Sequence, residues 1–226
     1  MLWRGSQLAM GSQNTLPTGF ECLNQELPQR GWPLSTLIEL TLSQTGIGEI
    51  RLLRPALAQL AAQRSIALVH PPCVPYFHCW SNWQLEAHRL LWVNAKTPGD
   101  AIWASEQILK HNACAALLLW APAIRPEAVR RLQLAAQQSD ALFILLRPAN
   151  AASQASAAPL RLSLKPVFQG LEVSILKRRG PSCSHPILIP LYPTRSYAQT
   201  PPPHAPLDQP VPTLFQSGRA LSSMVG

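Results

Sequence analysis

The sequence predicts an α/β protein: a mostly parallel, twisted sheet flanked by helices. Two observations lead to this prediction. Apolar runs alternate with helical patterns through the middle of the chain, and strands that alternate with helices form right-handed βαβ units. The runs 115–120 and 141–146 are apolar throughout, which is typical of strands buried on both faces of a parallel sheet.

Individual elements follow from these runs and from their flanking residues. Strands are predicted at 36–42, 65–70, 90–94, 115–120 and 141–146. Pro98 is placed to open a helix over 99–111. A second helix is predicted over 126–138, with Val129, Leu132, Leu134 and Ala136 facing inward. The runs 160–164 and 171–175 alternate with period two, which predicts a C-terminal β-hairpin at the edge of the sheet.

Composition divides the 226 residues into three zones. Residues 1–14 form a loose N-terminal segment, and residues 15–180 form the core domain. Residues 181–226 hold ten of the 23 prolines and are predicted to be a disordered tail, although short apolar clusters near its end suit a segment that orders on a partner.

Net charge and cysteine content limit the kinds of partner and the cellular compartment that we expect. A net charge of +8 admits an acidic partner, such as nucleic acid or an acidic protein face, or a merely solvated basic surface. The five cysteines are scattered without a C-x-x-C pair, which favours a reducing environment. The chain shows neither a signal peptide nor an apolar run long enough to cross a bilayer, so we expect a cytoplasmic protein without membrane contact.

The turn between the run 36–42 and the following helical segment has the outline of a phosphate-binding P-loop without its chemistry. A P-loop requires Gly-x-x-x-x-Gly-Lys-Ser/Thr. When Gly48 is aligned with the second glycine, the first glycine is Ser43, the lysine is Glu49 and the hydroxyl residue is Ile50. Glu49 places a carboxylate where phosphate needs a cation, so this degenerate P-loop is not expected to bind a nucleotide cofactor.

Pro55 conflicts with the helix that should follow this turn. A proline in the second helical turn removes a backbone hydrogen bond and clashes with the preceding turn. Either the helix kinks, or it begins near Arg54 with Pro55 in its first turn. We therefore expect Pro55 to break a P-loop helix, and we interpret Glu49 and Arg51 as surface contacts.

Several separated motifs resemble the RecA superfamily and, within it, the ImuA family of accessory proteins. The segment leading into the turn resembles the RecA core at Leu16-Pro17-Thr18-Gly19-Phe20, Gly31-Trp32-Pro33-Leu34 and Ile38-Glu39-Leu40. The ImuA resemblance rests on Leu2-Trp3-Arg4-Gly5, Gly31–Leu34, Gly48–Leu53, Ala101–Gln107, Arg130–Ala136, Arg147-Pro148 and Leu176–Gly180. The central stretch, including Phe143–Pro148, is also similar to the SulA family of cell-division inhibitors.

The resemblance implies a RecA-like core and a non-catalytic adaptor role in SOS-induced translesion (mutagenic) DNA synthesis and DNA repair. The implied partners are an ImuB-type polymerase-like protein and, beyond it, RecA and an error-prone DNA polymerase III alpha subunit. Residues 15–35 are the candidate surface for RecA. The alternative that the SulA similarity implies is an SOS cell-division inhibitor that binds FtsZ.

RecA-type ATPases also carry two catalytic carboxylates, and neither has a counterpart here. The run 115–120 ends in Trp120-Ala121-Pro122, and the run ending at His70 continues with Pro71-Pro72-Cys73-Val74-Pro75. Because phosphoryl transfer depends on a metal-binding and a water-orienting group, we expect no ATPase activity and assign no catalytic residue.

Three other groups of residues have side chains that could bind a metal ion, nucleic acid or a partner. His70, Cys73, His78 and Cys79 are close in sequence but lack a second ligand pair, so no metal site is predicted. Trp80, Trp83, Trp92 and Trp103 are interpreted as core or interface residues rather than base-stacking platforms. Candidate contacts to DNA or a partner are the basic residues Arg130, Arg131, Arg161, Lys177, Arg178 and Arg179.

Overall fold

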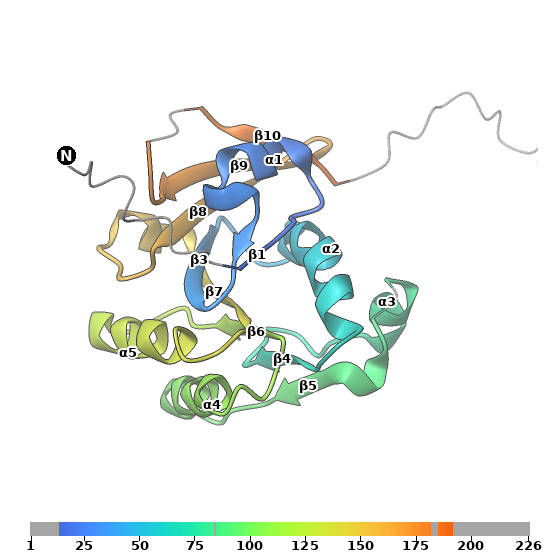
Figure 1. Ribbon diagram of the computed structural model, residues 1–226, viewed down its shortest axis with the longest axis vertical. Coiled ribbons are helices and arrows are strands. Elements are labelled where there is room, and N and C mark those ends of the chain that lie inside the picture. The colour runs from blue at the N-terminus through green and yellow to red at the C-terminus, as the bar shows by residue number, and fades with distance from the viewer. Residues whose placement is uncertain (1–13, 84, 182–184, 192–226) are drawn as a thin grey trace, which may run out of the picture. The chain divides into compact units, whose positions relative to one another are not determined.

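The structure is a computed structural model that describes residues 14–83, 85–181 and 185–191. An eight-stranded sheet with the order β10-β9-β8-β3-β7-β6-β4-β5 forms its centre (Figure 1). Neighbours from β8 to β5 are parallel, whereas β9 and β10 are antiparallel to their neighbours. The predicted α/β class, with a mostly parallel sheet flanked by helices, is confirmed.

The strands of this sheet are β3 (Thr36–Leu42), β4 (Ile66–Val69), β5 (Leu90–Val93), β6 (Ala116–Trp120), β7 (Leu142–Pro148), β8 (Leu160–Val167), β9 (Gly170–Lys177) and β10 (Ile187–Pro190). A separate two-stranded sheet pairs β1 (Thr15–Leu16) with β2 (Trp32–Pro33). The α-helices are α1 (Glu21–Glu26), α2 (Glu49–Ala61), α3 (Phe77–Asn82), α4 (Pro98–Lys110) and α5 (Pro126–Ala136). Short 3₁₀ helices occupy Pro28–Arg30, Ala87–Arg89 and Ala149–Ser153. All five predicted parallel strands and the β8–β9 hairpin are present.

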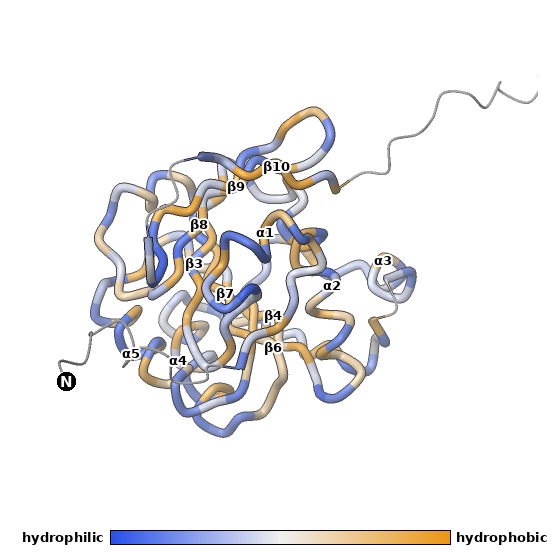
Figure 2. The backbone as a smooth tube through the Cα atoms, turned by 45° about the horizontal axis from the view of Figure 1, so that its top comes forward, coloured by the Kyte–Doolittle hydropathy of each residue, from blue (hydrophilic) through white to orange (hydrophobic). Residues whose placement is uncertain are grey.

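The sheet separates two apolar cores, which explains why its central strands are apolar throughout. Along β3, Ile38 and Leu40 pack on the face that α1 and α2 cover, whereas Leu37 packs on the face that α4 and α5 cover. Figure 1 shows α4 and α5 side by side, and Figure 2 shows the apolar residues gathered along the central strands. Burying a leucine side chain contributes about 1.5–3 kcal/mol, so these two layers supply most of the driving force for folding.

Helix α2 begins at Glu49 and runs through Pro55, so the prediction that Pro55 breaks this helix is wrong. Leu52, Leu53 and Leu57 lie on both sides of the proline and are fully buried. Their packing against the sheet outweighs the missing hydrogen bond at Pro55. The proline ring packs against Gly19, and the lack of a side chain there leaves room for the ring. A Cβ atom added to Gly19 would lie 2.5 Å from Pro55 Cβ.

Helix α5 buries three of the four residues predicted to face inward, Val129, Leu132 and Ala136, and the prediction is wrong only for Leu134. Leu134 is 61% exposed, whereas Gln133 is buried. Residues 132 and 134 lie about 200° apart around a helix of 3.6 residues per turn and therefore cannot share a face. The side-chain oxygen of Gln133 accepts a hydrogen bond from the Leu37 backbone N–H at 2.8 Å. This contact satisfies a donor at the start of β3 and ties α5 to the sheet.

The ordered sheet continues past residue 180, where the tail was expected to begin. β10 pairs with β9, and the Leu191 N–H donates to the Gln169 carbonyl at 3.1 Å. Gly170 is required at this junction, because an added Cβ would lie 2.0 Å from the Ile189 carbonyl oxygen. The predicted hairpin is therefore followed by one further edge strand. The remainder of the predicted tail, 192–226, and most of the predicted N-terminal segment lie outside the described residues.

Candidate functional site

The turn between β3 and α2 lies at the carboxyl end of the parallel strands. In open α/β sheets, ligands bind beyond these ends, at the point where the strand order reverses. Here β3 lies between β7 and β8, while the chain leaving α2 enters β4 on the far side of β7 and β6. A cavity of about 200 Å³ is lined by the turn residues Ser43–Thr45 and by the ends of β4, β6 and β7. The topology thus places a candidate binding site beside the degenerate P-loop.

The Glu49 side chain binds the turn that precedes it. One carboxylate oxygen accepts the Gly46 N–H at 2.9 Å, and the other accepts the Gly48 N–H at 3.1 Å. Glu49 is also the first residue of α2, where the helix dipole favours a negative charge. Backbone amides at such a helix N-terminus are the groups that bind phosphate in nucleotide-binding turns. In this chain, a carboxylate from the protein itself occupies two of them.

Ser43 and Ile50, the other positions aligned with the P-loop pattern, also lack the groups that bind phosphate and magnesium in a P-loop. Ser43 is exposed, and Ile50 lines a second, largely apolar cavity of about 210 Å³ that also contacts the Pro71–Pro75 loop. Glu49 is 2% exposed. The interpretation of Glu49 as a surface contact is therefore wrong, because its carboxylate is bound to the backbone amides of the turn. Arg51, by contrast, is exposed.

Gly48 is needed for structural reasons. Its φ angle is 116°, in the left-handed region that disfavours residues with a side chain. An added Cβ would also lie 2.7 Å from the Leu191 Cδ1 atom. Both the backbone conformation of Gly48 and its contact with Leu191 therefore require a glycine in this turn.

A second buried carboxylate, Glu39, lies in the middle of β3 and is paired with two arginines. Its Oε1 atom lies 2.9 Å from Arg161 Nη2 on β8 and 3.5 Å from Arg147 Nη1 on β7. The Ser156 hydroxyl donates to its other oxygen. Arg161 also donates to the Ala151 carbonyl at 2.9 Å, and Arg147 donates to Gln154 at 2.8 Å. We call Glu39, Arg147 and Arg161 the Glu39 cluster.

The Glu39 cluster was missed from the sequence, although a signal for it exists. A charged residue in the middle of a strand buried on both faces must be paired, because an isolated buried charge is strongly unfavourable. Glu39 alone interrupts the otherwise uncharged run 36–42, and Arg147 directly follows the run 141–146. The pairing of β3 with both β7 and β8, which brings these residues together, could not be read from the runs.

The carboxyl ends of β4 and β6 carry no carboxylate toward the cavity. Trp120 and Pro122 from β6 and its following loop line it, as do His70 and Pro72 after β4. The indole nitrogen of Trp120 is buried without a hydrogen-bond partner among the described residues. The cavity wall is therefore aromatic and proline-rich where an ATPase needs acidic groups.

The six predicted DNA or partner contacts do not form one surface. Arg161 is 7% exposed and belongs to the Glu39 cluster, so its assignment as an external contact is wrong. Arg178 folds back onto α1, where its guanidinium lies 3.0 Å from the Glu26 carboxylate. Arg131 on α5 is paired with Glu106 on α4 at 3.1 Å.

Of the others, Lys177 donates to the Ser156 carbonyl at 3.0 Å and remains exposed. Arg130 and Arg179 are exposed, on α5 and just beyond β9. Figures 1 and 2 both show α5 at a distance from β9. A continuous phosphate track through all six positions is not assembled, and DNA contact stays a prediction for the exposed ones.

The tryptophans divide between interior and surface. Trp80 is buried and meets Trp83 edge-on, with ring centroids 6.0 Å apart. Trp92 on the edge strand β5 and Trp103 on α4 are 43% and 63% exposed, which suits surface contact better than the core. In the part of the chain that the structure describes, no group of His, Cys, Asp or Glu side chains could hold a metal ion.

The fold and this site define an α/β protein with a mostly parallel sheet, in which Glu49 binds two backbone amides of the turn between β3 and α2. No protein-family model matches the chain, and no curated protein matches it. Among solved structures, it is similar to the crystal structure of SulA from Pseudomonas aeruginosa. That similarity has 23% identity and a TM-score of 0.42, and it covers 49% of this chain and 97% of the SulA chain. Among the described residues, no helix is long and apolar enough to cross a membrane.

Proposed function

We propose that the protein is a non-catalytic RecA-like adaptor in SOS-induced translesion DNA synthesis and DNA repair, acting with a polymerase-like partner of the ImuB type. The observation that supports the non-catalytic part is the bidentate contact of Glu49 with the Gly46 and Gly48 amides. A phosphate entering this turn would meet a carboxylate instead of a lysine. At about 4 Å and an effective dielectric constant near 20, two such negative charges repel by about 4 kcal/mol.

The acid-free wall of the neighbouring cavity supports the same conclusion. Magnesium binding and water activation in phosphoryl transfer depend on polar groups held near the phosphates. Trp120 and Pro122 stand at the end of β6, where no such group is available. These features support an adaptor role that does not involve nucleotide chemistry.

The assignment to translesion synthesis rests on the sequence resemblance to the ImuA family. Its motifs fall on well-formed elements: Gly31–Leu34 spans β2, Ala101–Gln107 lies on α4, and Arg130–Ala136 lies on α5. RecA and an error-prone polymerase III alpha subunit are the further partners that the resemblance implies, and residues 15–35 remain the candidate RecA surface. A SulA-like inhibitor of FtsZ is the alternative, since the central motif Phe143–Pro148 fits both families.

A parallel binding assay separates these functions. The purified chain is immobilised and exposed in turn to an ImuB-type protein, RecA and FtsZ, with an unrelated protein of similar charge as the control. We expect retention of the ImuB-type protein and no effect of the chain on FtsZ polymerisation measured by light scattering. Retention of FtsZ with loss of its polymerisation would instead establish the SulA-like function, and magnesium-dependent phosphate release from ATP would exclude a non-catalytic role.

A further inference from the structure

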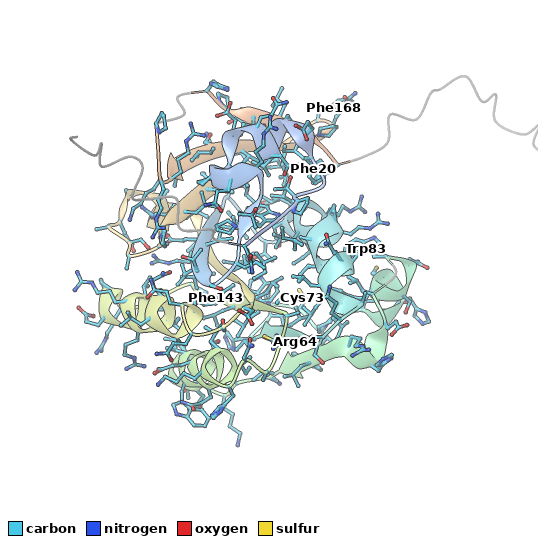
Figure 3. All side chains as sticks on the ribbon, in the orientation of Figure 1. Phe20, Arg64, Cys73, Trp83, Phe143 and Phe168 are labelled. Carbon is cyan, nitrogen blue, oxygen red and sulfur yellow. The ribbon has the colours of Figure 1, made fainter. Side chains whose placement is uncertain are left out.

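A basic and aromatic depression lies on the outer side of α2, away from the Glu39 cluster. It has a volume of about 350 Å³, and we call it the Arg54 pocket. Its lining residues are Phe20, Arg51, Arg54, Pro55, Trp83, Pro190 and Leu191. Figure 3 shows Phe20 and Trp83 on the side of the molecule that carries α2. The pocket thus joins α2 to the segments before α1, after α3 and at the end of β10.

Arg54 is exposed to solvent and lies over an aromatic ring. Its guanidinium carbon lies 5.9 Å from the centre of the Trp83 ring, a cation–π arrangement that restrains the side chain. Arg54 is exposed and makes no hydrogen bond or ion pair with the residues that the structure describes. A restrained guanidinium with unused donors is suited to a carboxylate, which it can bind with two parallel hydrogen bonds.

An apolar surface continues from this pocket. Val167, Phe168, Leu188 and Pro190, which we call the Phe168 patch, line a shallow depression at the β8–β9 turn and along β10. Phe168 is 97% exposed and Leu188 is 63% exposed. Pro190 lines both depressions, so the two meet at this residue. Figure 3 shows Phe168 on the same side of the molecule as Phe20.

Phe168 is not covered by any of the residues that the structure describes. An almost fully exposed phenylalanine at the tip of a hairpin gains nothing from the core and leaves its ring in water. Contiguous exposed apolar side chains of this kind mark interaction surfaces. Aromatic and arginine side chains together are the residues that most often dominate binding energy at protein interfaces.

We propose that the Arg54 pocket and the Phe168 patch form one docking surface for an acidic peptide segment of a protein partner. A carboxylate of the segment binds Arg54, Arg51 adds positive charge beside it, and apolar side chains of the segment cover Phe168 and Leu188. Charge complementarity supports this occupant, because no acidic side chain is among the described residues that line the two depressions, and the chain carries a net charge of +8. The inference goes beyond the proposed function and does not depend on which partner carries the segment.

Single-stranded nucleic acid fits this surface less well. Base stacking needs an open aromatic face, whereas Arg54 lies over Trp83 and both Trp83 and Phe20 are packed against the core. A nucleic-acid backbone also needs cations along its path, and the Phe168 patch supplies none among its lining residues. The combination of two arginines with an uncharged apolar extension therefore favours a peptide.

Fluorescence anisotropy with the full chain tests the proposal. The probe is a short labelled peptide of glutamate, leucine and phenylalanine, and the comparison probes are the same peptide with lysine in place of glutamate and a labelled oligothymidylate. Arg51→Ala/Arg54→Ala removes the basic side, and Phe168→Ser removes the apolar side. The matched controls are Lys96→Ala/Arg125→Ala, which removes the same charge at two exposed positions outside the docking surface, and Leu134→Ser, which removes an exposed apolar side chain from α5.

We expect the acidic peptide to bind and the lysine peptide not to bind. The double arginine variant should weaken binding about tenfold or more, and Phe168→Ser several-fold, while both controls stay within about twofold. Arg54→Gln, which retains hydrogen-bonding groups without the charge, should weaken binding as well, so a folding defect of the alanine variant does not leave the proposal untested. Equal binding by the double variant and its control, tighter binding of oligothymidylate than of the acidic peptide, or no saturable binding of the acidic peptide would each overturn the proposal.

Discussion

Glu39 in β3 and Glu49 at the start of α2 are two buried carboxylates that are stabilised in different ways. Glu39 is 0% exposed and is paired with arginines from two neighbouring strands. Glu49 is 2% exposed and is bound by two backbone amides of its own turn. Glu39 therefore depends on residues more than 100 positions away, whereas Glu49 depends on residues within three.

The Glu39 cluster therefore stabilises the sheet, whereas the Glu49 contact stabilises the turn between β3 and α2. The Glu39 cluster links β3, β7 and β8 at their shared face, and removing one member leaves charges buried without a partner. The Glu49 contact is local, and removing it returns two amides to solvent. The first interaction joins three neighbouring strands, and the second occupies two backbone amides at the start of α2.

The largest effect is expected for Glu39→Ala. This change leaves Arg147 and Arg161 buried without their shared counter-ion, and breaking a buried ion pair costs about 3–5 kcal/mol. Urea denaturation followed by circular dichroism measures the loss. The exposed pair Lys165–Glu172, at 3.9 Å, provides the control, because Lys165→Ala should cost less than about 1 kcal/mol. A loss of similar size for both variants would contradict the role given to the cluster.

Gly48→Ala should be the next most damaging change. The left-handed φ angle and the 2.7 Å approach of Leu191 both oppose a Cβ atom there, and together they predict a loss of about 2–3 kcal/mol in unfolding free energy. Gly46→Ala is the matched control, because Gly46 also has a positive φ angle, 83°, but open space around it. If the two variants unfold at the same denaturant concentration, contact with Leu191 does not constrain the turn.

Glu49→Ala should have a smaller effect on stability. The variant loses two charge-assisted hydrogen bonds, but the turn amides can bind water, so a loss of about 1–2 kcal/mol is expected by thermal or chemical denaturation. Inorganic phosphate should raise the melting temperature of Glu49→Ala more than that of the wild type, since the amides of Gly46 and Gly48 are then free. Equal phosphate responses would show that Glu49 does not occupy an anion site.

The smallest effect concerns Glu106, a carboxylate that is neutralised at the surface rather than in the core. Its hydrogen bond to Lys110, with further help from Arg131, lowers the pKa of Glu106 below its ordinary value. A carboxyl group with a lowered folded-state pKa stabilises the protein above its unfolded pKa, and this contribution is lost as the pH falls through the folded pKa. Glu106→Gln should therefore cost about 0.3–1 kcal/mol at neutral pH and nothing in strong acid, measured by urea denaturation at both pH values. A cost that persists in acid would point to packing rather than charge.

The sequence predicted the strands better than it predicted the contacts between them. The parallel strands and the 160–177 hairpin follow from apolar runs and period-two alternation, which are local signals. The course of α2 through Pro55 was mispredicted because tertiary packing of Leu52, Leu53 and Leu57 overrides a local preference. β10 escaped detection because a strand of four residues, Ile187–Pro190, lies in a proline-rich stretch and is recruited by β9.

Prediction of the site was similarly divided. The alignment of Ser43, Gly48, Glu49 and Ile50 with a P-loop pattern placed a turn before α2, and the structure has a turn between β3 and α2, because that information is contained in adjacent residues. The return of the Glu49 carboxylate onto Gly46 and Gly48 required the backbone conformation of the turn. The burial of Arg161 required the strand order, which no single run contains.

Calorimetric titration of the wild-type chain with magnesium–ATP shows whether the Glu49 carboxylate excludes a nucleotide from the turn between β3 and α2. We expect no saturable heat of binding in wild-type protein that is shown to be folded by circular dichroism. Saturable binding of magnesium–ATP, abolished by Gly48→Ala, would contradict it.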